Sequence, residues 1–177
     1  MPEKSKPNRS AAPHYSYITY CSNTDLTHPG ETHSLLDRSE NHIKKSKPEY
    51  RRVFSLSIEW SGPLAVGLAR QCEVMTVDTL RKMRFRSESS TSEHFFGCHN
   101  EARRIMIGAA QIIFELIAER LEIDTPIINW YDINSPVHKG VPNEIMHRES
   151  IVVAEDHRKF AHGVWQGNIW AYGNDGP

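Results

Sequence analysis

The sequence predicts an α+β fold, in which helices pack on one face of a mostly antiparallel sheet. Residues 53–60 alternate apolar and polar side chains, as a half-buried strand does. Residues 100–122 repeat apolar side chains at helical spacing over the longest apolar run of the chain. Strand-like runs then follow this helix. With 177 residues and 38% hydrophobic content, the chain has room for one core.

Residues 1–52 are expected to be a flexible basic arm and linker, followed by a single globular domain over 53–177. The first 14 residues contain three prolines and no large apolar residue. The run YSYITY at 15–20 predicts a short strand, whose partner is either this domain's own sheet or a neighbouring molecule. Residues 21–52 are polar and turn-rich, so we expect no core element there.

The folded region is predicted to begin with the strand Val53–Trp60, which Pro63 and its neighbours terminate. A helix over Leu64–Met75 follows, and Thr76 is placed to cap a further short helix that ends in a second basic cluster. Residues 87–93, SESSTSE, are small and polar, which is typical of a mobile loop. Phosphorylation of this loop would put negative charge beside the basic cluster.

The central helix is predicted over Asn100–Glu122. Asn100 can accept from the free amides of its first turn, and Arg120 suits the negative end of the helix dipole. Gly108 and two alanines leave one flank thin, so a sheet or second helix can approach closely. A buried strand is predicted over 127–131, then a loop, and then an antiparallel pair formed by 145–154 and 160–172.

Charge is distributed unevenly along the chain, although the net charge is −1. Residues 1–52 carry nine Lys and Arg against six Asp and Glu, whereas 123–177 carry four against seven. A basic arm can be attracted to nucleic acid, to anionic lipid or to the acidic end of another copy. The alternative is a solvated tail whose charge only keeps it soluble.

The sequence contains no recognisable enzyme signature, and we predict no catalytic residue, metal or cofactor. His94 and His99, like His157 and His162, are five residues apart, a spacing that does not direct two side chains to one metal ion. Cys98 lacks the context of a nucleophile. Three distant cysteines predict reduced thiols, and the absence of a signal segment or membrane span predicts a cytosolic protein.

The order of elements resembles that of rhabdovirus matrix proteins, in particular the smaller, plant-infecting (cytorhabdovirus-like) members. The likeness rests on a basic arm, the strand VFSLSIEW with its proline turn and helix, the apolar helix RRIMIGAAQIIFELIA and the closing run VWQGNIWAYG. It implies a structural protein that self-associates, condenses the ribonucleocapsid and links it to the envelope during budding. The implied locations are the inner face of the envelope in the virion, and the cytoplasm and membranes of the host cell.

The resemblance implies four partners: other copies of the chain, the viral nucleoprotein–RNA complex, an anionic membrane surface and the viral glycoprotein. The residues expected to meet lipid or nucleocapsid are basic, namely Lys4, Lys6, Arg9, Lys44, Lys45, Lys47, Arg51 and Arg52. Those expected to dock on the next copy come from the aromatic strand and the 132–142 loop, namely Tyr15, Tyr17, Ile18, Tyr20, Pro136, Val137 and Val141. The alternative function is a small hydrolase or nuclease with a histidine and acid site within Glu144–His162.

Overall fold

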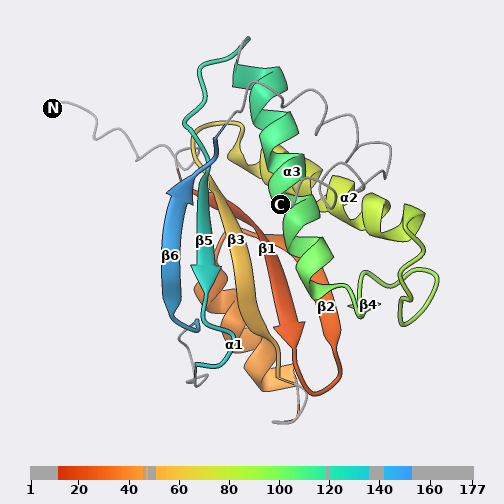
Figure 1. Ribbon diagram of the computed structural model, residues 1–177. Helices are drawn as coiled ribbons and strands as arrows, with labels where there is room; N and C mark the ends of the chain where they lie inside the picture. The colour runs from red at the N-terminus through yellow and green to blue at the C-terminus, as the bar shows by residue number, and fades with distance from the viewer. Residues whose placement is uncertain (1–11, 46, 48–50, 119, 136–141, 153–177) are drawn as a thin grey trace, which may run out of the picture.

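The computed structural model describes residues 12–45, 47, 51–118, 120–135 and 142–152. These residues form one six-stranded sheet in the order β4-β2-β1-β3-β5-β6, together with three helices (Figure 1). Every neighbouring pair of strands is antiparallel, so the predicted α+β class is confirmed. The strands are β1 His14–Cys21, β2 Leu26–Thr32, β3 Val53–Trp60, β4 Phe95–Phe96, β5 Ile127–Tyr131 and β6 Ile145–Ser150. The helices are α1 Leu35–Lys45, α2 Ala65–Lys82 and α3 His99–Ala118.

The main core lies between one face of the sheet and the helices α2 and α3. Side chains alternate along the strands, so Ile18, Leu56 and Ile58 point to these helices and are fully buried. Each such side chain contributes roughly 1.5–3 kcal/mol through burial. The two helices approach closely, since the Sγ atom of Cys72 lies 3.5 Å from the carbonyl oxygen of Met106. Ala109 and Ala110 of the predicted thin flank are fully buried in this core.

A second, smaller core lies under α1 on the opposite face of the sheet. Tyr17 precedes Ile18 in β1, so its side chain points to the other face of the sheet, away from α2 and α3. Its ring meets that of Phe54 edge-on, with centroids 5.4 Å apart. The cluster consists of Tyr17, Phe54 and Tyr131, with Leu35 of α1 packed against it. The prediction that helices cover one face is thus corrected: α2 and α3 share a face, and α1 lies on the other.

Most elements predicted after residue 52 are found. β3 and β5 have the predicted bounds. The predicted central helix, Asn100–Glu122, is α3, His99–Ala118, so its start agrees within one residue and its end is about one turn earlier. Leu116 lies within the predicted apolar run, yet its side chain is 65% exposed. A single helix, α2, replaces the two predicted over 64–82. The reason is that Thr76 donates its hydroxyl to the Cys72 carbonyl, four residues back, instead of capping a new helix.

Residues 14–45 form β1, β2 and α1 of the folded domain, so the prediction of a flexible arm with no core element in 21–52 is wrong for them. β1 lies between β2 and β3, which means that the YSYITY strand pairs within its own domain. β2 was missed because Pro29 and Gly30 are typical of turns. Beyond Thr27 the outer side of β2 has no described strand partner, so a proline without an N–H is tolerated there.

The Asn143 side chain forms hydrogen bonds with the β3 backbone at Phe54, beyond the stretch of β3 that pairs with β5. Its side chain accepts from the Phe54 N–H at 2.8 Å and donates to the Phe54 carbonyl at 2.6 Å. The side chain is buried, so its loss would leave two backbone groups without partners. We expect Asn143→Ala to lower the free energy of unfolding by about 2 kcal/mol. Urea denaturation measures this, and an unchanged midpoint would contradict it.

Candidate interaction surfaces

Four cations gather at the end of α2, and we call them the basic turn: Arg81, Lys82, Arg84 and Arg86. All four side chains are exposed. Arg84 adopts the left-handed conformation (φ 62°), and the Phe85 N–H donates to the Leu80 carbonyl, which together end the helix in a Schellman motif. Phe85 and Met83 pack against the main core, so the cations between and beside them point to solvent.

Two cations of the basic turn have contacts within the domain that can be described. Arg81 and Asp78 are 3.9 Å apart and both exposed, a geometry that contributes little. Arg86 lies over the ring of Phe96, with its guanidinium carbon 4.8 Å from the ring centroid. The predicted mobile loop 87–93 is the tip of a hairpin, because Phe96 donates to Arg86 and Glu88 donates to His94 through the backbone. This hairpin fixes the end of the basic turn against β4.

β6 is the outermost strand at the opposite edge of the sheet. All six of its residues are exposed, including Ile145 and Met146, the latter 67% exposed. It pairs with β5 on its inner side, and no described strand pairs with its outer side. Such an edge can pair with an added strand. Figure 1 shows β6 and the end of α2 on opposite sides of the sheet, so both surfaces can be occupied at once.

The basic residues predicted to meet lipid or nucleocapsid are placed differently from one another. Lys4, Lys6 and Arg9 lie outside the described residues, and Lys44 and Lys45 end α1. Lys47 is exposed, whereas Arg51 and Arg52 are half-buried. The guanidinium of Arg52 is 2.5 Å from the Nε2 atom of His94, so it is engaged within the domain.

The residues predicted to dock on a neighbouring copy are mostly inside the fold or outside the described part. Tyr17 and Ile18 are fully buried, which corrects their assignment to a contact between copies. Tyr15 and Tyr20 are half-buried, and Tyr20 stacks on His99 with ring centroids 4.0 Å apart. The three positions of the 132–142 loop, Pro136, Val137 and Val141, lie outside the described residues.

Several histidines are packed among arginines rather than around a metal. His28 stacks on His94 with centroids 4.4 Å apart, and its Nδ1 atom has no described hydrogen-bond partner. Burial, and then the nearby His94, Arg52, Arg38 and His42, holds the pKa of His28 well below its usual range. Burial and Arg52 also lower the pKa of His94. These rings are therefore neutral at pH 7.

A bulge in β3 positions another histidine. Ile18 is opposite Leu56 and Thr19 is opposite Phe54, so Ser55 is the extra residue of β3. The Ser55 hydroxyl lies 2.7 Å from the Nε2 atom of His99 at the start of α3. Burial, and then Arg103, lowers the pKa of His99 to about 4.

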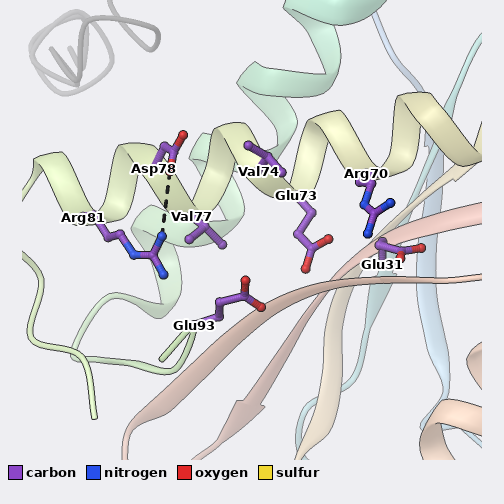
Figure 2. A pocket seen from close by; sticks show the side chains of 8 residues that line it. All are labelled: Glu31, Arg70, Glu73, Val74, Val77, Asp78, Arg81 and Glu93. Carbon is purple, nitrogen blue, oxygen red and sulfur yellow. Dashed lines mark ion pairs between the residues drawn. The ribbon is translucent and has the colours of Figure 1, made fainter. Parts of the chain in front are cut away.

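A polar groove of about 410 Å³ lies between α2 and β2 (Figure 2). Glu73 points into it between Glu93 on one side and Glu31 on the other. Burial, and then the charges of Glu93 and Glu31, raises the pKa of Glu73 to about 7. The lining residues are Glu31, Arg70, Glu73, Val74, Val77, Asp78, Arg81 and Glu93.

The described residues contain no group of three or more side chains placed to hold a metal ion. Cys98 is buried, and burial raises its pKa to about 12, so its thiol is protonated at neutral pH.

The alternative function, a hydrolase or nuclease, would have its site within Glu144–His162. Residues 144–152 of this region are described and include β6, while His157 and His162 lie outside the described residues. No helix within the described ranges has the length and apolar character that crossing a membrane requires.

Comparisons of the chain with protein-family models, with curated proteins and with solved structures find no match.

The sequence predicts the interaction surfaces only in part. The sequence predicts the basic turn as a second basic cluster but does not mark it as a site, although its alternation with Met83 and Phe85 is a signal of exposed cations beside buried apolar residues. That β6 is an edge depends on strand order, which the sequence pattern does not specify.

Proposed function

We propose that this chain is a non-enzymatic structural protein of the matrix type. In this role it self-associates, condenses a ribonucleocapsid and links it to the inner face of an envelope membrane. The nucleoprotein–RNA complex and anionic lipid are its two acidic partners, and the envelope glycoprotein is a further one. The order of elements along the sequence, which resembles that of rhabdovirus matrix proteins, motivates this proposal.

The observation that carries the proposal is the basic turn. Four exposed cations within six residues form a surface that attracts phosphate groups of lipid or nucleic acid. Near an anionic membrane each such cation contributes about 1 kcal/mol. The structure supports the basic turn in this role more directly than Arg52, which contacts His94.

The arrangement of the sheet supports assembly as well as binding. The basic turn adjoins the β4 edge, and β6 is the opposite edge. A molecule can therefore contact an acidic surface at one edge and another protein at the other. Because many copies act together in a lattice, each contact can be weak.

Vesicle co-sedimentation tests the proposal. We expect the full chain to sediment with vesicles that contain phosphatidylserine and not with neutral phosphatidylcholine vesicles, and to dissociate as salt is raised. Arg84→Glu combined with Arg86→Glu should weaken binding about tenfold or more, because two cations become repulsive charges.

The matched control is Arg104→Glu combined with Arg120→Glu, which makes the same charge change at two exposed positions outside the basic turn. This control should retain most of the binding. Equal loss in both double variants would show that only net charge matters and would count against the basic turn. Failure of the unmodified chain to bind either anionic vesicles or single-stranded RNA at low salt would refute the proposed function.

A further inference from the structure

We propose that β6 pairs antiparallel with β6 of a second copy, in a register centred on Arg148. This inference rests on the self-association in the proposed function and specifies the surface that provides it. The two sheets would join edge to edge into one continuous sheet, and the two copies would be related by a two-fold axis. Each copy would therefore contribute the same residues to the contact. The partner is thus a second copy of this chain.

The hydrogen bonds of β6 determine which backbone groups are available. Ile151 donates its N–H to the Pro126 carbonyl, so it forms a hydrogen-bonded pair on the inner side. In an antiparallel ladder these pairs alternate with pairs whose backbone groups point away. Glu149 and His147 therefore bond inward to β5, while the N–H and C=O groups of Arg148 and Ser150 point outward.

This alternation limits the registers in which two copies can pair. Outward groups must meet outward groups, and side chains on one face must meet side chains on the same face. Centring on Arg148 satisfies both conditions and places His147 of each copy opposite Glu149 of the other. Centring on Glu149 also satisfies both, but it brings two identical carboxylates together.

The side chains of β6 favour the register centred on Arg148. His147 and Glu149 share a face, and their side chains are 3.7 Å apart and exposed. One oxygen of Glu149 accepts from the Trp130 indole, and its other oxygen faces His147, so on pairing it can accept from His147 of the second copy instead. The two Arg148 side chains meet on the other face, where each lies 3.4 Å from its own Glu59 carboxylate. This ion pair reduces the repulsion between them. The bulge opposite Tyr131 lies at Met146, at the end of the paired stretch.

A charge exchange tests the register. His147→Glu places carboxylates opposite Glu149 of the second copy, and Glu149→Lys takes away the carboxylate that would accept from His147 of the second copy. We expect each single variant to raise the dissociation constant of self-association about tenfold, as measured by analytical ultracentrifugation. An equimolar mixture of the two variants should regain the original affinity, because glutamate then faces lysine and histidine faces glutamate.

The matched controls are His33→Glu and Glu122→Lys, which make the same charge changes at exposed positions outside β6. Both should associate as the unmodified chain does. If the single variants associate normally, or if their mixture is not restored, the β6 register is wrong while self-association stands. A different result would be an unmodified chain that binds anionic vesicles but stays monomeric at all concentrations. In that case both the β6 register and the self-association in the proposed function are wrong.

Discussion

Gly30→Ala is expected to lower the free energy of unfolding by about 3 kcal/mol, at the upper end of the usual cost of overpacking. Gly30 lies opposite Tyr17 in the pairing of β1 with β2, and the tyrosine ring covers it. A Cβ atom at Gly30 would lie 2.4 Å from both Cζ and the hydroxyl oxygen of Tyr17. No real contact is that short, so the ring or the strand must move.

The Tyr17 ring has nowhere to move. Its side chain is fully buried, Arg38 donates to its hydroxyl at 2.6 Å, and Phe54 packs against it edge-on. Displacing the ring would disrupt the whole cluster under α1. The expected damage is therefore greater than that of a methyl group added to an exposed strand.

Gly67→Ala is the matched control for this substitution. Gly67 lies in the first turn of α2, and a Cβ atom there would meet nothing within 4 Å. Alanine is favoured over glycine in a helix by up to about 1 kcal/mol, so this variant should be slightly more stable. Urea denaturation of both variants decides the point. Equal midpoints for Gly30→Ala and the unmodified chain would mean that Tyr17 does not cover β2 as described.

Gly30 also explains why part of the fold could not be read from the sequence. Pattern analysis finds elements whose own side chains carry the signal, as in the alternating Val53–Trp60 and the apolar α3. In β2 the segment THPGE resembles a turn, and its place in the sheet depends on Tyr17, thirteen residues earlier. Propensity and periodicity describe neighbours in sequence, and this contact is between strands.

The candidate surfaces could be predicted from the sequence only where their residues are neighbours in the chain. The cations of the basic turn are adjacent in sequence, so the cluster itself was found. Arg52 was grouped with Lys44, Lys45 and Lys47 because they are close in sequence, yet its guanidinium bonds to His94, 42 residues away. Whether a charge faces solvent or another side chain depends on packing that local sequence does not record.

Histidines kept neutral in the fold are expected by themselves to remove about 2–3 kcal/mol of stability between pH 7 and pH 5. The pKa of His28, His94 and His99 is lowered, in each case mainly by burial. The unfolded chain binds protons on these rings below about pH 6.5, while the folded chain does not. Unfolding therefore takes up protons, and stability falls as pH falls.

His28 should dominate this loss. Its ring is 7% exposed, so the full linkage of about 1.4 kcal/mol per pH unit applies to it below pH 6.5. His94 and His99 are half-buried and contribute less, because water screens their charge. Glu73 acts with the opposite sign. Its pKa of about 7 in the fold, against 4.5 in the unfolded chain, gives the folded state an extra proton between these values, so stability rises as pH falls through that window.

Two variants separate these contributions. His28→Leu removes the buried titrating ring and should flatten the dependence of stability on pH below 6.5 by about 1.4 kcal/mol per unit. Glu73→Gln removes the opposing carboxyl and should make the loss steeper. Urea denaturation at pH 7.5, 6.0 and 5.0 measures both slopes. His33→Gln is the control, since His33 is exposed to water in the folded chain as in the unfolded one.

The position of His94 indicates where the acid effect should appear first. His94 belongs to the hairpin that follows the basic turn, and it stacks on His28 of β2. Protonating both rings would place two positive charges 4.4 Å apart beside Arg52 and push the hairpin away from β2. The Phe96 amide, which bonds to the Arg86 carbonyl, should then exchange with solvent faster at pH 5.5 than amides of β3. Uniform acceleration across the sheet, or a Glu73→Gln variant whose stability does not change from pH 7 to 5, would rule out this arrangement of histidines.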